Sequence, residues 1–329
     1  MMCLKMRKRK LSIKYKNYLG LDGQEHKLVQ QVGDGSIIIR FDKTPFPTCQ
    51  EDVICPHFLE LKWGYGCPYQ CAWCYLQGTL RRLPSKTKPV IKDYSKIRLH
   101  LESFFDDTVN NGYIPEIINA GEIADSLMAE NGPDPFSRFV TTIFETQKKH
   151  KILFLSKSGN INNILKLESD MILPSFTLNA VSVSKRWEKK APSIKKRIRD
   201  AKKLSDSGYP VRIRIDPIVP VENWENDYLN LIRDIFLEFI PERVTLGSLR
   251  GLQSTINNSD DRSWTSYLSE RSNWGKKIDS ATRYSIYSRI IDYLNENYDY
   301  TSIALCKETK AMWEALHMDY QNMKCNCVW

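Results

Sequence analysis

Three cysteines near residue 70 are the residues of this sequence best suited to chemistry. Cys67, Cys71 and Cys74 follow the spacing C-x3-C-x2-C within one short loop. Thiolates are the usual ligands of iron–sulfur clusters, and three of them can bind three irons of a [4Fe–4S] cluster while the fourth iron stays open. Gly64 and Gly66 precede the first cysteine and allow the backbone to turn closely around a cluster. We therefore predict a [4Fe–4S] cluster with one open iron in this loop.

Zinc is the alternative occupant of these three thiolates. A structural zinc site has four protein ligands, and no other Cys or His lies close to this loop in the sequence, since His57 is at the far end of the preceding strand. The spacing and the missing fourth ligand favour the iron–sulfur cluster. Trp73 adds a flat apolar face beside the third cysteine, against which an adenine or a core side chain could pack.

Three further cysteines lie late in the sequence. Cys306 follows an expected strand, and Cys325 and Cys327 are separated by one asparagine. These thiols could bind a second iron–sulfur cluster, form a redox-active pair or donate a hydrogen atom. Idle thiols in a frayed tail are the remaining alternative. We favour a second cluster held by Cys306, Cys325 and Cys327.

The composition indicates the kind of partner and the cellular compartment. The chain has 329 residues, 42% of them hydrophobic, and a net charge of +9. This charge suits an anionic partner such as a nucleotide, a nucleic acid or a phosphorylated metabolite, or else a lysine-rich solvated surface. The basic run at 5–16 could bind nucleic acid or form a flexible charged terminus. No apolar stretch has the length of a membrane span or of a secretory signal, so we expect a cytoplasmic protein without membrane contact.

The elements that must position these cysteines alternate between strand and helix. A separate strand is expected at 36–41, and the alternation begins at residue 58. Strands are expected at 58–63, 116–120, 151–155, 175–179, 211–215, 243–247 and 301–305, and helices at about 94–110, 135–149, 160–167, 192–207, 226–239, 279–297 and 308–317. The alternation predicts an α/β fold, a partial (β/α)6 TIM-like barrel with right-handed crossovers. We divide the chain into an N-terminal extension (1–57), the barrel (58–250) and a C-terminal extension (251–329), in which 252–276 is expected to be a long loop.

Several polar residues follow the expected strands directly. In a barrel, residues at the C-terminal ends of the strands meet at one mouth. The cysteine loop, Gly121 with Glu122, Lys157, Asn179 and Asp216 all occupy such positions. We therefore expect one site that combines them. Arg212 and Arg214 share one face of their strand, but the sequence leaves open whether that face lies inside the barrel.

The cysteine loop after the first strand resembles that of the radical S-adenosylmethionine (SAM) superfamily. The segment from Cys71 to Leu80 is similar to the corresponding segment of the spore photoproduct lyase branch, as are 119–125, 156–157, 178–179 and 217–225 in the same order. The resemblance covers roughly residues 58–250. It implies a radical SAM enzyme that cleaves SAM at a [4Fe–4S] cluster to a 5′-deoxyadenosyl radical, which abstracts hydrogen from a substrate. It also implies an electron donor such as flavodoxin or ferredoxin.

The same resemblance implies which residues contact SAM. Gly121 and Glu122 would hold the methionine amino group, which Asp125 could also bind; capping a following helix is the alternative for Asp125. Lys157 would pair with the carboxylate, and Asn179 would hydrogen-bond the ribose. Asp216 and Trp73 complete the cofactor-binding residues that we expect.

Two positions depart from the lyase of this branch. The lyase has two tyrosines that relay a hydrogen atom where this chain has Trp73 and Tyr75, and a hydrogen-donating cysteine at or next to the position of Glu122. We therefore predict a radical SAM enzyme that is not a spore photoproduct lyase, with Tyr75, Glu122 and Cys306 as candidate catalytic residues. Its substrate would be a nucleotide or nucleic acid, or a small biosynthetic metabolite; a peptide is the least supported class. A non-catalytic iron–sulfur or zinc protein that binds nucleic acid is the alternative.

Overall fold

One large sheet organises the molecule. The computed structural model describes residues 10–82 and 88–329, and in this part of the chain ten strands form a single sheet. In spatial order they are β1 (Ile13–Leu19), β2 (Glu25–Val32), β3 (Ile38–Phe41), β5 (Phe58–Leu61), β8 (Ile117–Asn119), β9 (Lys151–Ser156), β10 (Ile172–Leu178), β11 (Arg212–Ile218), β12 (Arg243–Ser248) and β16 (Ile303–Leu305). From β5 to β16 all neighbours are parallel, whereas β1, β2 and β3 add an antiparallel edge.

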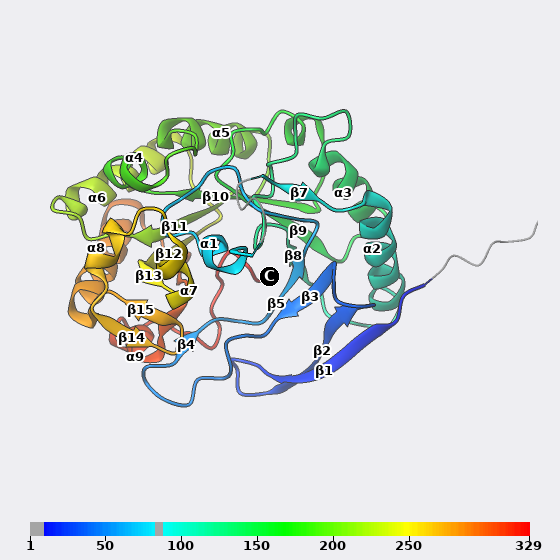
Figure 1. The fold of residues 1–329 in the computed structure, drawn as a ribbon, viewed down its shortest axis with the longest axis horizontal. Helices are drawn as coiled ribbons and strands as arrows, with labels where there is room; N and C mark the ends of the chain where they lie inside the picture. The colour runs from blue at the N-terminus through cyan, green and yellow to red at the C-terminus, as the bar shows by residue number, and fades with distance from the viewer. Residues whose placement is uncertain (1–9, 83–87) are drawn as a thin grey trace, which may run out of the picture.

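Helices connect the parallel strands and cover the outside of the sheet, which curves around a central space (Figure 1). Their bounds are α2 (Tyr94–Thr108), α3 (Phe136–Phe144), α4 (Val181–Trp187), α5 (Ile194–Asp206), α6 (Trp224–Glu238), α8 (Ser280–Tyr298) and α9 (Lys310–Ala315). All seven residues of β10 are buried. Strands of parallel sheets are commonly buried on both faces. The helices cover the outer face of β10, and the interior of the curved sheet covers the other.

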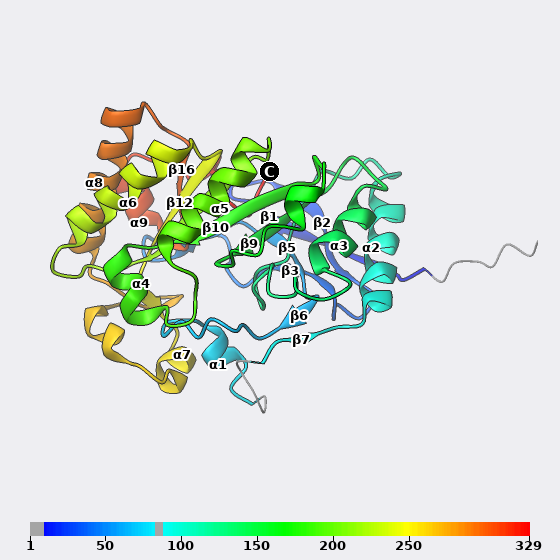
Figure 2. The ribbon, with the colours of Figure 1, turned by 90° about the horizontal axis from the view of Figure 1, so that it is seen from above.

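Two short helices lie at one end of the curved sheet. They are α1 (Leu76–Thr79), directly after the cysteine loop, and α7 (Gln253–Asn258). Figure 2 shows both at the opposite end of the molecule from the C-terminus. In Figure 1 the C-terminus lies in the middle of the ring of strands. The last residues therefore enter the space inside the sheet from the end that faces away from the cysteine loop.

The observed elements follow most of the sequence-based expectations. The predicted strands and helices from 94 to 317 are present with end points shifted by a few residues, except that a 3-10 turn at Ile164–Lys166 replaces the helix expected at 160–167. The partial barrel is confirmed. The predicted strand at 36–41 is present as β3. The three predicted segments are joined by the sheet itself, because the N-terminal extension contributes β1 to β3 and the C-terminal extension contributes β16.

One expectation was wrong. The region 252–276 is not a long loop: it contains α7, a 3-10 turn at Ser263–Tyr267 and the strands β14 (Glu270–Ser272) and β15 (Gly275–Lys277). These strands pair with β13 (Arg250–Gly251) in a small separate sheet. The segment is rich in polar residues and shows no regular apolar pattern, so its helix and strands were not predicted. Its Trp264 is nevertheless fully buried. The basic run at 5–16 lies partly, and Cys3 wholly, outside the described residues.

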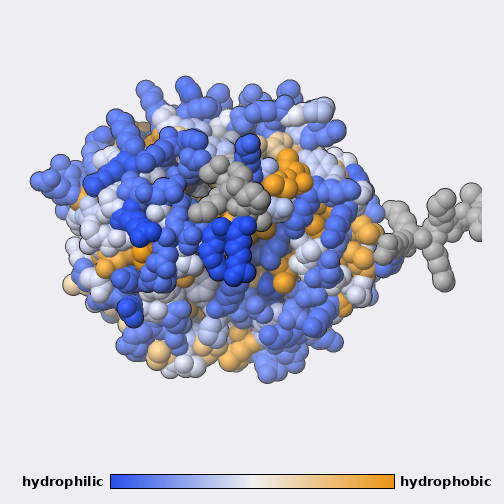
Figure 3. Space-filling view, in the orientation of Figure 1, coloured by the Kyte–Doolittle hydropathy of each residue, from blue (hydrophilic) through white to orange (hydrophobic). Residues whose placement is uncertain are grey.

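The outer surface in the view of Figure 3 is mostly hydrophilic, with apolar side chains in small separate groups. Within residues 10–82 and 88–329, no helix combines the length and apolar character that crossing a bilayer requires. Two further strand pairs lie outside the large sheet. They are β4 (Val53–Ile54) with β17 (Glu308–Thr309) and β6 (Gly64–Tyr65) with β7 (Val90–Ile91). The β6 strand leads directly into the cysteine loop.

Candidate active site

A cavity of about 450 Å³ lies inside the curved sheet, beneath the cysteine loop. Its size is that of a pocket for a small ligand. The lining includes residues from both ends of the sequence: Cys67, Cys71 and Cys74, and also Cys306, Cys325 and Cys327. The structure thus brings together the two groups of cysteines, which the sequence separates by more than 200 residues.

The cysteine loop is attached to the segment after β8. Gly66 has a φ of +89°, in the left-handed region that glycine tolerates. Its backbone N–H donates to the carbonyl of Ile123 over 3.1 Å, and it forms an isolated bridge with Ala124. Within the loop, the N–H of Cys74 donates to the carbonyl of Cys71 over 3.1 Å, which closes a tight turn. The loop and the 121–125 segment are therefore positioned by each other.

Contacts on the outer side of the loop come from regions later in the sequence. The N–H of Ala72 donates to the carbonyl of Trp187 at 2.9 Å, and the Ser259 hydroxyl donates to the carbonyl of Ala72 at 2.8 Å. The ring of Trp73 packs against that of Trp187 with centroids 5.6 Å apart. Trp73 therefore contacts a core side chain on one side and lines the cavity on another; packing against an adenine stays a prediction.

The three loop cysteines fit a cluster better than a single ion. Among the described residues, no three His, Cys, Asp or Glu side chains are grouped closely enough to hold one metal ion. A zinc ion needs every thiolate sulfur at about 2.3 Å from one centre. In a [4Fe–4S] cluster each thiolate binds a different iron, so the sulfur atoms stand further apart. The enclosed position raises the pKa of the Cys67, Cys71 and Cys74 thiols. Binding of a cluster would therefore displace protons.

Asp125 ties two strand ends together at the cavity wall. Its carboxylate accepts hydrogen bonds from the Ser156 hydroxyl (2.6 Å) and from the backbone N–H groups of Lys157 (2.8 Å) and Leu127 (3.0 Å). It caps no α-helix, because the next helix begins at Phe136. Burial raises the pKa of this carboxyl, and the carboxylate remains part of the cavity lining. Asp125 thus holds two strand ends together and is also part of the cavity lining.

Lys157 already has an ionic partner. Its ammonium lies 3.0 Å from a carboxylate oxygen of Glu188, and the second oxygen of Glu188 accepts from the guanidinium of Arg197 at 2.7 Å. Glu188 and Arg197 are fully enclosed. Glu188 and Arg197 therefore fix the position of the Lys157 ammonium, which an anion in the cavity could bind. Glu188 was not expected from the sequence, because it follows α4, a helix that was not predicted.

Asn179 lies behind the cavity wall. It is fully buried; its amide donates to the carbonyl of Pro217 at 2.8 Å and its oxygen accepts from the Tyr228 hydroxyl at 2.8 Å. It does not belong to the residues that line the cavity. These bonds give Asn179 a structural role at the end of β10, and its contact with the ribose stays a prediction without support from this geometry.

Tyr75 and Glu122 meet at the cavity. The Tyr75 hydroxyl donates to the backbone carbonyl of Glu122 and lies 3.3 Å from its carboxylate. On the other side, the amide of Asn119 donates to that carboxylate at 3.2 Å and lies 3.8 Å from Sγ of Cys327. One asparagine therefore links Glu122 to a thiol of the C-terminal tail.

Asp216 forms a two-point ion pair with Arg250. Both carboxylate oxygens lie 2.9 Å from guanidinium nitrogens, and Nη2 of Arg250 lies 3.6 Å from Sγ of Cys306. Arg250 holds the pKa of the Asp216 carboxyl below its ordinary value despite burial, and burial raises the pKa of Cys306 to about 11. Asp216 and Cys306 therefore reach the cavity as predicted, but as parts of one charged group.

The two arginines of β11 both point into the barrel, where they contact the C-terminal tail. Arg212 donates to the backbone carbonyls of Asn326 (2.8 Å) and Val328 (3.1 Å), and Arg214 donates to Sγ of Cys327 (3.1 Å). The question that the sequence left open is thereby answered. The alternation of side chains along a strand places Asp216 on the same inner face.

The cavity also contains a carboxyl group that sequence reasoning missed. Glu60 on β5 lies 3.5 Å from the ammonium of Lys62. Burial, together with the nearby charge of Glu122, raises the pKa of Glu60 to about 7. An acidic residue within the first barrel strand was the only sequence feature that could have indicated it.

Comparisons with known proteins identify the family of this chain. The sequence model of the spore photoproduct lyase family matches residues 59–247, more than half of the chain. The chain belongs to the spore photoproduct lyase family. The resemblance inferred from the cysteine loop is thus confirmed.

Two curated relatives are both named spore photoproduct lyase. The protein from Clostridium acetobutylicum is 23% identical over 210 residues, and that from Bacillus subtilis is 25% identical over 221 residues. These matches cover 59% and 57% of this chain and the same shares of the relatives. The chain therefore matches less than two thirds of the length of either relative.

Solved structures share the fold. A spore photoproduct lyase complexed with dinucleoside spore photoproduct superposes with a TM-score of 0.62 at 14% identity over 75% of both chains. A mutant with bound AdoMet and dinucleoside spore photoproduct gives 0.61 at 14% identity, over 80% of this chain and 78% of that chain. At this identity the likeness establishes the architecture, which is the predicted partial barrel.

Proposed function

We propose that this protein is a radical SAM enzyme whose substrate is a nucleotide or a segment of nucleic acid other than the spore photoproduct. The observation that carries the proposal is the meeting of Cys67, Cys71 and Cys74 with strand-end polar residues around one cavity. When bound, a [4Fe–4S] cluster with SAM would supply a 5′-deoxyadenosyl radical that abstracts hydrogen. Family membership and the donor set support this assignment.

The chain's own residues would bind and orient the cofactors. The three loop thiols would hold the cluster, and the Gly121–Glu122 strand end would face the amino group of SAM. Lys157, held by Glu188, offers an ammonium to a carboxylate, which favours a charge-assisted contact. The surrounding strands and α1 enclose the cavity, and exclusion of water protects reactive intermediates from side reactions.

The charges around the cavity support an anionic substrate. Cationic side chains in its lining outnumber the carboxylates; they are Lys43, Lys62, Lys157, Arg214, Arg250 and Lys307. The ammonium of Lys307 lies 4.1 Å from the ring centroid of Phe41 and 4.0 Å from that of Trp274. A cation next to two aromatic rings suits a ligand that combines a phosphate with a planar base. A small anionic metabolite is the alternative substrate.

The proposal excludes the spore photoproduct because of two residues. Glu122 stands at or next to the position of the hydrogen-donating cysteine of the family's lyase, and Trp73 at the position of one of its tyrosines. A carboxylic acid cannot donate a hydrogen atom as a thiol does, so a thiol donor in this chain would have to come from outside this segment. We expect no thymine release from a dinucleoside spore photoproduct under conditions in which SAM is cleaved. Conversion at the rate of a lyase would overturn this part of the proposal.

The central test is production of 5′-deoxyadenosine. The protein would be loaded anaerobically with iron and sulfide, reduced with dithionite or with a flavodoxin or ferredoxin, and given SAM. We expect 5′-deoxyadenosine and methionine from the wild type and none from Cys74→Ser. Cys49→Ser is the matched control, because Cys49 is exposed and lies outside the cavity. A fully loaded wild type that makes no 5′-deoxyadenosine would instead favour a non-catalytic iron–sulfur protein.

The substrate class has its own experiment. Nucleotides and short oligonucleotides would be compared with phosphorylated sugars for their ability to accelerate 5′-deoxyadenosine formation. We expect acceleration by the nucleic-acid components that weakens as salt increases, because phosphate contacts release counterions. Acceleration by the sugars alone would support the metabolite alternative. A reduced electron carrier and a cytoplasmic location belong to the same proposal.

A second iron–sulfur cluster on Cys306, Cys325 and Cys327 is one of two mutually exclusive uses of these thiols; a redox-active pair of Cys325 and Cys327 is the other. The support for the cluster is that all three thiols line the same cavity and that Arg214 and Arg250 could balance thiolate charge. Two four-iron clusters would bring about eight irons per chain, and replacing these three cysteines would halve that number. An unchanged iron content would exclude the second cluster.

A further inference from the structure

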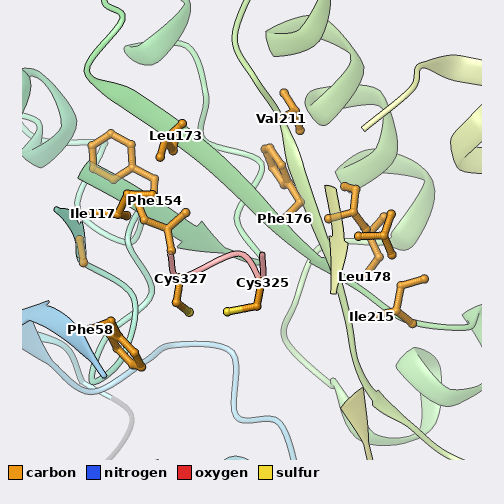
Figure 4. Close-up of a cluster of buried hydrophobic side chains, with 14 of the residues drawn as sticks. Phe58, Ile117, Phe154, Leu173, Phe176, Leu178, Val211, Ile215, Cys325 and Cys327 are labelled. Atoms are coloured by element: carbon orange, nitrogen blue, oxygen red, sulfur yellow. The ribbon is translucent and has the colours of Figure 1, made fainter. Parts of the chain in front are cut away.

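We propose that Cys325 and Cys327 form a redox-active dithiol that supplies reducing equivalents to the cavity. Figure 4 shows the sulfur atoms of the two side chains next to one another. Each side chain is only 5% exposed. Their contact is the arrangement from which a disulfide can form.

The contact between the sulfurs distinguishes a dithiol from cluster ligands. Cysteines that bind different irons of a cluster point toward separate corners, so their sulfur atoms do not touch. Cys306 is directed elsewhere, toward the guanidinium of Arg250 at 3.6 Å. The geometry therefore favours a pair plus a separate thiol.

The residue between the two cysteines fixes their position. Asn326 is fully buried; its backbone N–H donates to the Thr245 hydroxyl (3.1 Å), which donates in turn to the Asn326 side-chain oxygen (2.7 Å). Its amide nitrogen donates to the hydroxyl of Ser175 at 2.8 Å. A buried residue with this many hydrogen bonds is costly to displace, so the tail is a built part of the barrel interior.

Backbone contacts on either side complete the anchor. Arg243 donates to the carbonyls of Cys325 (3.1 Å) and Val328 (3.0 Å), and the Val328 N–H donates back to the carbonyl of Cys325 at 3.4 Å. The resulting turn directs both cysteine side chains toward the cavity, whose lining includes them. A frayed tail with idle thiols is inconsistent with these bonds.

The pair is connected to the expected reaction site. Sγ of Cys327 accepts from Arg214 at 3.1 Å and lies 3.8 Å from the Asn119 amide, which also contacts the carboxylate of Glu122. A thiol thus stands one side chain away from Glu122, although the segment 75–305 contains no cysteine. Cys327 is consequently the thiol of the pair closest to the SAM-facing strand end.

The redox step, which rests on the proposed radical function, balances as follows. Cys327 gives a hydrogen atom to a carbon-centred substrate radical, so its S–H bond breaks and a C–H bond forms. The sulfur of Cys325 then bonds to that of Cys327; its proton goes to solvent, and the remaining electron goes to an oxidised carrier of the flavodoxin or ferredoxin class. A dithiol reductant restores both thiols by thiol–disulfide exchange.

A tryptic peptide allows a direct test that does not depend on SAM cleavage. Lys324 precedes Cys325, so trypsin releases residues 325–329 with both cysteines and no other. The cluster-loaded protein would be oxidised with the disulfide form of a small dithiol, alkylated and digested. We expect this peptide to be lighter than the unalkylated dithiol by two hydrogen atoms, and to return to a doubly alkylated form after reduction.

Variants and metal content complete the experiment. Cys49→Ser should retain the oxidisable pair, whereas Cys325→Ser and Cys327→Ser should each leave one thiol that is alkylated under all conditions. A pair that stays reduced throughout the oxidative titration would overturn the proposal, as would iron and sulfide contents that fall in Cys325→Ser and Cys327→Ser. If the disulfide forms but no 5′-deoxyadenosine is made, the proposed radical function fails while the redox pair stands. If 5′-deoxyadenosine is made but no disulfide forms, only the redox pair fails.

Discussion

The guanidinium of Arg214 donates a hydrogen bond to Sγ of Cys327 over 3.1 Å, although 113 residues separate them in the sequence. Nε of the same arginine is buried and has no hydrogen-bond partner among the described residues. A guanidinium next to a sulfur stabilises the thiolate more than the disulfide. The contact therefore bears on the redox behaviour of the tail as well as on its position.

Replacing Arg214 should make the Cys325–Cys327 disulfide harder to reduce. Arg214→Ala removes a positive charge that stabilises the reduced form, so the midpoint potential should fall by about 30 mV, the shift that corresponds to about 1.4 kcal/mol for two electrons. Titration of the tryptic peptide in dithiol buffers measures it. Arg214→Lys should retain part of the effect, and the exposed Arg199→Ala should show none. An equal potential in all four proteins would contradict the assignment.

Arg212 should contribute to stability through the tail. It is 2% exposed and joins Glu242 to the carbonyls of Asn326 and Val328. Arg212→Ala should lower the free energy of unfolding by about 2–3 kcal/mol, because charged hydrogen bonds to buried groups are lost. Urea denaturation provides the measurement. Arg233→Ala, on an exposed face of α6, is the control and should change the free energy of unfolding little. Similar values for both variants would mean that the tail is not anchored as described.

Gly78 should be required for correct placement of the cysteine loop. A Cβ at this position would lie 2.6 Å from the backbone carbon of Ser254, so Gly78→Ala must push α1 away from α7. We expect a loss of about 1–3 kcal/mol and weaker retention of iron after gel filtration. Gly132→Ala is the matched control, because its Cβ would meet no atom within 4 Å. Full iron retention in Gly78→Ala would show that the loop does not depend on this packing.

Glu60 should give the protein a stability that falls with rising pH. Its pKa is raised from 4.5 to about 7 in the folded state, so the unfolded chain loses this proton first. The contribution of Glu60 to the free energy of unfolding should therefore decrease between about pH 4.5 and 7 and remain constant above, by up to about 3 kcal/mol. Denaturation of wild type and Glu60→Gln across this range measures the difference.

In Glu60→Gln this component should be absent, so the variant gains stability relative to wild type as the pH rises. Glu51→Gln provides a control at an exposed carboxyl. A constant difference between wild type and Glu60→Gln from pH 4 to 8 would mean that Glu60 ionises normally. Because Glu60 lines the cavity beside the expected SAM site, the same titration would also report on occupancy by a charged ligand.

Local sequence determined the start of the proposed chemistry. Cys67, Cys71 and Cys74 lie within eight residues, and their spacing predicts a cluster because a short loop alone decides which thiols can meet. The alternation of strands and helices predicted the parallel sheet, since burial on both faces produces continuous apolar runs such as 152–155 in β9. Positions directly after strands, such as Gly121, Glu122 and Lys157, could be placed at one mouth because the ends of parallel strands meet there.

Only the tertiary structure shows that the C-terminal tail lies across the cavity from the cysteine loop. The tail enters the barrel because Arg212, Arg243 and Thr245 on its inner face bind the backbone and side chain around Asn326, and no local pattern in either segment reveals that contact. The same holds for Glu188, which holds Lys157, and for Asn119, which joins Glu122 to Cys327. Such pairings depend on which inward side chains meet across the closed sheet, and their partners lie tens to hundreds of residues apart in the chain.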